Sequence, residues 1–203
     1  MARRTKAEAE ATREALLDAA EEVFFDNGVA RTSLEQIARH AGMTRGALYW
    51  HFKNKADLFM ALIERVRMPF EELVETLQKP ELMDDPIKAL RVAFDNGFAR
   101  LEQPHRHRVH AILLHRCEFF SDINPLEMQQ RLVEECHLEL LGQFKRAQAC
   151  GQLRDDLPPE TAARLMQATL SGVFHDWLRA PECYSIRARG NLLLNALLDM
   201  MSR

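Results

Sequence analysis

The sequence has no apolar stretch long enough to cross a membrane. Its longest apolar runs, such as residues 192–198, are interrupted by Asn195 and fall well short of the ~20 residues that a bilayer span needs. Arg3, Arg4 and Lys6 near the start are not followed by an apolar core, so this region does not have the form of a secretory signal. We therefore expect a cytoplasmic protein with no membrane partner.

Cysteine is scarce, and the signatures of common enzyme classes are missing. The four cysteines at positions 117, 136, 150 and 183 have no CxxC spacing, so we interpret them as reduced, small apolar residues, with a redox sensor as the alternative. The sequence has no nucleophile elbow, glycine-rich phosphate loop or HExxH motif. We therefore expect no enzymatic activity, no catalytic residue and no cofactor.

An excess of positive charge is also missing from the chain as a whole, whose formal net charge is −3. The charge is unevenly distributed. Residues 29–55 hold five Lys or Arg against one acid, a local charge of +4, whereas residues 56–203 hold 18 basic and 22 acidic residues, a local charge of −4. A basic segment in an acidic chain favours nucleic-acid binding by that segment.

The basic segment contains three short helices, each with a predicted cap. Thr32, followed three residues later by Glu35, has the form of a capping box, and Thr44 and Asn54 are predicted to cap the next two helices. Between the first two, Gly42 allows a tight turn with a positive φ. This compact pattern is typical of a helix-turn-helix.

The second of these helices has an unusual solvent face. Leu48 and Phe52 are four residues apart and are expected to pack inward. The remaining positions carry small, cationic and aromatic residues that fit a helix in the major groove, with its first residues on base edges. They are Arg45, Gly46, Ala47, Tyr49, Trp50 and His51.

The segment resembles the helix-turn-helix of the TetR family of transcriptional repressors. The run TRGALYWHFKNKADLF (residues 44–59) carries most of this resemblance. The opening ARRTKAEAEATREALLDAAEEVF (residues 2–24) and CEF (residues 117–119) resemble the AcrR-like branch, which represses multidrug efflux pumps. The similarity is dense over the first quarter of the chain and patchy afterwards.

By this resemblance, two groups of residues in the basic segment are expected to contact double-stranded operator DNA. Thr44, Arg45, Gly46 and Ala47 would read base edges, and Arg45 is the best candidate for a bidentate contact to guanine. The residues expected to hold phosphates are Tyr49, Trp50, His51, Thr32 and Lys55.

Pro and Gly mark the breaks in a sequence that otherwise favours helices throughout. We predict an all-α fold of about nine helices, with a helix-turn-helix DNA-binding domain at 1–55 and a ligand-binding and dimerisation domain at 56–203. Predicted helices run from Ala7 to Asp26, from Lys55 to about Leu77 across Pro69, from Pro86, Pro104 and Pro125 onward, from Pro159 to Arg179, and from Ser185 to Met201.

The final predicted helix is apolar on nearly every face, which indicates burial on two sides. One side would meet the core of the chain and the other a second copy. We therefore expect a homodimer formed through the last two helices as a four-helix bundle, as the family resemblance also implies. The alternative is a single central helix in a monomer.

Apolar and a few polar side chains in the second half of the sequence suggest a pocket for a small hydrophobic effector. For each of these residues, ordinary core packing is the competing interpretation. They are Phe94, Phe98, His110, Leu113, Leu114, Cys117, Cys136, Met166, Leu170, Val173, Phe174 and Trp177. Effector binding would release the operator by favouring a conformation in which the two reading helices are too far apart, and Pro69 is a candidate for this coupling.

Two other kinds of regulator stay open. His105, His107, His110, His115 and the pair Cys136-His137 are close in sequence, but they lack a recognised metal-ligand spacing, so we assign no metal site. A regulator of unrelated metabolic genes is a further alternative.

Overall fold

The computed structural model describes residues 6–65, 75–77, 79–121 and 123–203. Within these ranges every element is helical, apart from two isolated bridges that join Phe120 to Ile123 and Leu153 to Ser202. The all-α prediction is therefore confirmed. No helix in this part of the chain is long and apolar enough to span a bilayer.

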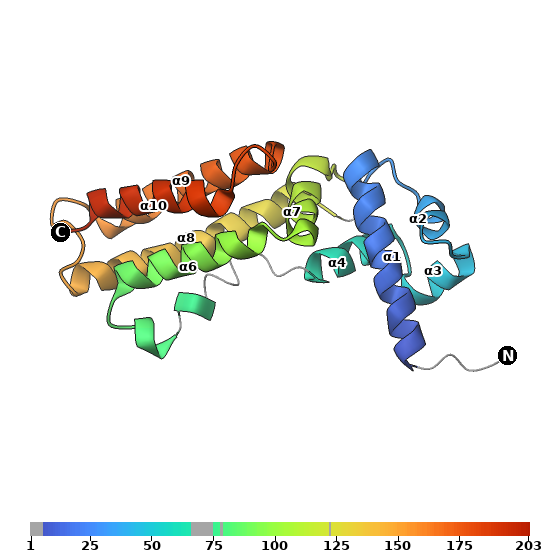
Figure 1. Cartoon of the computed structure of the whole chain (residues 1–203), viewed down its shortest axis with the longest axis horizontal. Helices are drawn as coiled ribbons and strands as arrows, with labels where there is room; N and C mark the ends of the chain where they lie inside the picture. The colour runs from blue at the N-terminus through green and yellow to red at the C-terminus, as the bar shows by residue number, and fades with distance from the viewer. Residues whose placement is uncertain (1–5, 66–74, 78, 122) are drawn as a thin grey trace. The chain divides into compact units, whose positions relative to one another are not determined.

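The chain divides into two compact units, one within residues 1–66 and 108–126 and the other within 67–107 and 127–203. Figure 1 labels the helices of both. The first unit is discontinuous in sequence. The boundary predicted between residues 55 and 56 lies inside it, because the unit continues through α4 and takes in a segment from the middle of the chain.

Four helices from the N-terminal part of the chain build most of the first unit. They are α1 (Lys6–Asn27), α2 (Leu34–His40), α3 (Arg45–His51) and α4 (Lys55–Arg65). Leu16, Phe24, Ile37, Leu48 and Leu58 are fully buried and form its core. As predicted, α1 stops at Gly28, whose φ is +81°, and the turn before α3 contains Gly42 with a φ of +66°.

The predicted capping box at Thr32 and Glu35 is wrong by one residue. Ser33 is the N-cap of α2: its side chain accepts a hydrogen bond from the Gln36 amide, and the Gln36 side chain accepts one from the Ser33 amide. Thr32 is only 2% exposed, and its hydroxyl donates to the Gly28 carbonyl over 2.8 Å. Because this hydroxyl closes the α1–α2 turn, the next residue caps α2.

The other predicted caps of the segment are confirmed. Thr44 accepts a hydrogen bond from the Ala47 amide over 3.2 Å, and Asn54 accepts one from the Asp57 amide over 2.8 Å. The continuation of α4 beyond Arg65 and the bend at Pro69 fall on residues 66–74, outside the described ranges, whereas residues 75–77 are helical.

The middle of the chain adds residues 108–126 to the first unit, and these include the second half of one helix and the whole of the next. α7 (Pro104–Ala111) runs directly into η2 (Ile112–Arg116), which has π-helical geometry. Val109, Ile112 and Leu113 are fully buried, and η2 packs against α1. The predicted helix start at Pro104 is confirmed.

The second unit is built around α6 (Pro86–Leu101), α8 (Pro125–Ala149), α9 (Pro159–Arg179) and α10 (Ile186–Met201), with the short η1 (Pro80–Leu82) before them. The predicted starts at Pro86 and Pro125 and the predicted range of α9 are confirmed. α10 packs on both α6 and α9 (Figure 1). Arg91 and Asp95 of α6 bind Asn195 and Arg187 of α10 over 2.9 and 2.8 Å.

Gly190 lets α10 approach α6 closely, because a Cβ atom there would lie 2.7 Å from Cε2 of the Phe98 ring. A helical Gly→Ala change ordinarily stabilises a protein by about 0.5 to 1 kcal/mol. Here we expect the opposite sign: Gly190→Ala should lower the free energy of unfolding by about 1 to 3 kcal/mol, as overpacking does. Urea unfolding checks this, with Gly142→Ala as the control, because a Cβ at Gly142 of α8 has no neighbour within 4 Å. Equal shifts in the two variants would contradict the prediction.

Candidate nucleic-acid interface

α3 presents one face to the core of the first unit and the opposite face to solvent. As predicted, Leu48 and Phe52 are buried and fix the helix to α1 and α2. On the outer face Arg45, Tyr49 and Trp50 are exposed, and the Trp50 side chain is 72% exposed. Aromatic residues with this exposure are typical of a surface that binds a partner.

Arg45 and Tyr49 form a pair at the beginning of this outer face. The Arg45 guanidinium lies 5.2 Å from the centre of the Tyr49 ring, and its Nη2 is 3.5 Å from the Tyr49 hydroxyl. Stacking on an aromatic ring restricts a guanidinium while leaving its edge exposed. Two N–H groups of such a guanidinium would donate hydrogen bonds to a base edge in the major groove.

Gly46 lies next to this pair. A Cβ atom added there would meet only the Thr44 hydroxyl, at 3.9 Å. Within the described part of the chain, no neighbour therefore requires a glycine at this helical position, where alanine would favour the helix. The absence of a side chain does leave room for a partner to approach the backbone of α3.

Trp50 and His51 follow on the next turn. Their ring centres are 4.6 Å apart and the rings are nearly perpendicular. His51 is half-buried, whereas Trp50 extends into solvent. Thr44, Arg45, Gly46, Ala47, Tyr49, Trp50 and His51 all belong to one short capped helix, so the structure brings this part of the predicted DNA-binding set together.

Thr32 and Lys55 have their polar groups directed into the protein. The Thr32 hydroxyl is bonded to Gly28. The Lys55 ammonium donates to the carbonyls of Val29, Ala30 and Thr32 over 2.8, 2.9 and 3.0 Å. Burial lowers the pKa of Lys55, against the opposing influence of Cys117. Phosphate contacts by these two residues stay predictions, and each would compete with hydrogen bonds already made.

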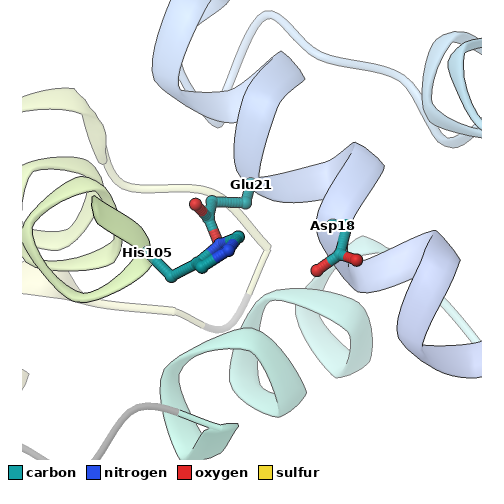
Figure 2. Close-up of side chains that lie close together, drawn as sticks. All are labelled: Asp18, Glu21 and His105. Atoms are coloured by element: carbon teal, nitrogen blue, oxygen red, sulfur yellow. The ribbon is translucent and has the colours of Figure 1, made fainter. Parts of the chain in front are cut away.

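A buried carboxylate, which the sequence reasoning missed, joins three helices of the first unit. Glu21 and Asp18 project from α1 (Figure 2). The Glu21 side chain is 1% exposed and accepts from Arg65 of α4 over 2.8 Å and from Arg108 of α7 over 2.7 Å. Burial works to lower the pKa of Arg65, but the hydrogen bond that Arg65 donates to Asp18 and the surrounding carboxylates outweigh it and raise that pKa. Glu21 follows Leu17 by four residues and therefore lies on the apolar stripe of α1. This position in the sequence indicates that Glu21 is buried.

The predicted effector residues are divided between the two units. His110, Leu113, Leu114 and Cys117 belong to the first unit and the other eight to the second. In the second unit Phe94, Phe98, Met166, Val173 and Trp177 are buried, and Cys136, Leu170 and Phe174 are half-buried. A hollow of about 530 Å³ in this unit is lined by other residues, namely His137, Glu160, Thr161, Arg164 and Leu165.

Trp177, one of these predicted effector residues, has a buried polar group. It lies on α9, and the His107 ring packs edge-on against it with the ring centres 5.9 Å apart. Its indole N–H is buried and meets no acceptor within the described residues. Buried donors of this kind are usually hydrogen-bonded to a protein group, an ordered water or a ligand.

Two cysteines have surroundings that disfavour redox chemistry. Burial raises the pKa of Cys117 to about 12, with a smaller contribution from Glu118 and opposition from Lys55. Burial, together with the charge of Glu139, raises the pKa of Cys136 to about 11. Since the thiolate is the reactive form, neither thiol has the character of a redox sensor.

α10 has two apolar sides, as expected. Leu194 and Leu198 are fully buried in the second unit, whereas Leu192, Leu193 and Met200 are exposed. Leu165 of α9 is exposed as well. The last two helices therefore present apolar surface to solvent.

Comparison with known proteins agrees with this geometry. Residues 16–62 match the family of bacterial regulatory proteins of the tetR family, and residues 85–203 match the C-terminal region of MAATS-type transcriptional repressors. The HTH-type transcriptional regulator TtgR of Pseudomonas putida is 36% identical over 99% of this chain and 96% of its own length.

Two solved structures resemble the chain over nearly its whole length. NalD, the secondary repressor of the MexAB-OprM multidrug efflux pump in Pseudomonas aeruginosa, has 37% identity and a TM-score of 0.81, with 98% of this chain and 99% of NalD covered. The SmeT–triclosan complex has 39% identity and a TM-score of 0.78, with 95% and 92% covered. SmeT is the repressor of the Stenotrophomonas maltophilia pump SmeDEF. With a helix-turn-helix in the first unit and matches that extend through the second, the chain belongs to the TetR family of transcriptional regulators.

Proposed function

We propose that the protein is a ligand-responsive repressor that binds a palindromic operator as a homodimer and controls a multidrug efflux pump operon. Similarity over nearly the full length to NalD and SmeT, both named as repressors of such pumps, supports the kind of gene that it controls. The proposal that the protein binds operator DNA rests on the outer face of α3. Arg45 stands at its start, and no close packing among the described residues requires Gly46 to lack a side chain.

In this proposal α3 enters the major groove. Thr44, Arg45, Gly46 and Ala47 face base edges, and Tyr49, Trp50 and His51 hold phosphates. The exposed apolar residues of α9 and α10 support dimerisation through these helices. A two-fold dimer would place two α3 helices about 34 to 36 Å apart, in successive major grooves of an inverted repeat.

The proposed effector is a small hydrophobic or aromatic antimicrobial compound. The complex of SmeT with triclosan supports this class, and the buried indole N–H of Trp177 supports a ligand with one hydrogen-bond acceptor among apolar neighbours. Release requires that the effector bind more tightly to a conformation that does not fit the operator. The test is a footprint on the DNA upstream of the gene, repeated with a panel of such compounds. A footprint that no compound weakens would contradict effector control.

Arg45→Ala should reduce discrimination between the operator and a copy in which the guanine contacted by Arg45 is replaced. A bidentate contact to guanine accounts for about 1 to 3 kcal/mol of discrimination against the wrong base. This energy corresponds to about 5- to 150-fold, so we expect the preference for the footprinted site over a copy in which the contacted guanine is replaced to fall by a factor in this range. Fluorescence anisotropy on the two duplexes measures it.

Lys53→Ala is the matched control, because Lys53 is an exposed cation just after α3. Losing a charge that contacts only phosphates should weaken binding to both duplexes by the same factor and reduce its salt dependence. If Arg45→Ala also weakened both duplexes equally, the assignment of Arg45 to base reading would be wrong.

A further inference from the structure

Phe120 comes from the middle of the chain, yet its side chain lies in the core of the first unit. It is buried, and its ring stands perpendicular to the Phe59 ring of α4, with the ring centres 5.4 Å apart. A tight turn fixes its backbone: the Phe120 amide donates to the Ile123 carbonyl, the Ile123 amide donates to the Phe120 carbonyl over 2.9 Å, and Ser121 between them has a φ of +48°. The ring therefore has a defined position.

The face of this ring covers the Lys55 ammonium, whose Nζ is 5.1 Å from the ring centre. A partly buried ammonium needs its desolvation offset by specific partners. Here the partners are the aromatic face and the three carbonyls of Val29, Ala30 and Thr32. Without the ring, the ammonium would lose its aromatic partner.

The three carbonyls belong to the turn between α1 and α2, which a second contact from the same segment also holds. The Val29 amide donates to the Arg116 carbonyl over 3.0 Å. Arg116 ends the π-helical η2, where the last carbonyls have no partner within the helix. Its guanidinium also lies 5.7 Å from the centre of the Phe25 ring, near the end of α1. Residues 108–126 thus hold the α1–α2 turn at two points.

We propose that Phe120 is a positioning residue for operator recognition, an inference that rests on the proposed function. By holding Lys55 on the α1–α2 turn, it fixes the place where Ser33 begins α2. α3 packs against α2, so the orientation of the reading helix depends on a residue that never touches DNA.

Two substitutions of Phe120 distinguish the contribution of its aromatic face from that of apolar packing. Phe120→Leu keeps an apolar side chain but removes the aromatic face, whereas Phe120→Tyr keeps the face. We expect Phe120→Leu to weaken operator binding by about three- to thirty-fold, the range that a cation–π contact allows, and Phe120→Tyr to bind like the wild type. Equal affinity of Phe120→Leu and the wild type would overturn the inference, as would an equal loss in the two variants.

Hydrogen exchange provides a readout that does not require DNA. In Phe120→Leu the Val29 and Thr32 amides should exchange faster than in the wild type, while the Leu48 amide of α3, bonded to the Thr44 carbonyl, should keep its rate. A faster rate across the whole first unit would indicate general unfolding and would overturn the inference. If the wild type preferred no inverted repeat, the proposed function would fail. The exchange rates would still decide whether Phe120 holds the turn.

Discussion

Glu21→Gln is expected to lower the free energy of unfolding by about 2 to 4 kcal/mol, since removing one member of a buried ion pair leaves uncompensated charge. The Glu21 carboxylate is almost fully buried and forms ion pairs with both Arg65 and Arg108. The two guanidinium groups are themselves partly exposed, with 21% and 28% of their side chains accessible, so water will offset part of the loss. Urea unfolding followed by circular dichroism measures it.

Asp18→Asn is the matched control, because Asp18 binds the same Arg65, over 2.6 Å, from one turn earlier on α1. The Asp18 side chain is 56% exposed. Exposed ion pairs typically contribute about 0 to 1 kcal/mol, so this variant should stay within that range of the wild type. If the two variants lost the same stability, burial of Glu21 would not be the reason for its effect.

Leu192→Glu is expected to convert the proposed dimer into monomers at micromolar concentration. In a two-fold interface each substitution appears twice, so a single change places two unpaired carboxylates in one apolar surface. A loss of about 4 kcal/mol, the scale of a buried unpaired charge, corresponds to a dissociation constant about a thousand-fold higher. Sedimentation equilibrium measures the constant, and operator affinity should fall to that of a half-site.

Leu126→Glu is the control for this change. Leu126 is 67% exposed and Leu192 is 70% exposed, so the two substitutions add the same charge at equally accessible leucines. Leu126 is the second residue of α8, outside the proposed interface. A dimer that survives Leu192→Glu would place the interface on other helices.

Sequence patterns predicted the features that depend on local chemistry. Proline at helix starts, glycine at helix ends and the caps at Thr44 and Asn54 act through residues within a few positions of each other. The capping box was misplaced by one residue because Thr32 and Ser33 are both good caps. In the structure, the hydrogen bond from the Thr32 hydroxyl to Gly28 and the capping box between Ser33 and Gln36 distinguish them.

Contacts between distant parts of the chain were beyond this reasoning. Lys55 was predicted to hold phosphate, but its ammonium lies on carbonyls 23 to 26 residues earlier in the chain. Glu21 meets Arg65 and Arg108, which are 44 and 87 residues later. Periodicity places a residue on a face of its own helix, but it does not identify the residue on the opposing element.

The split composition of the first unit has a consequence for biosynthesis. A ribosome delivers α1 to α4 well before residues 108–126, which supply Arg108, the Arg116 carbonyl and Phe120 to that unit. Domains usually fold as units while they emerge. Here the first unit is complete only after residues 108–126 have been synthesised. A truncated product that stops before residue 108 would therefore lack part of this unit.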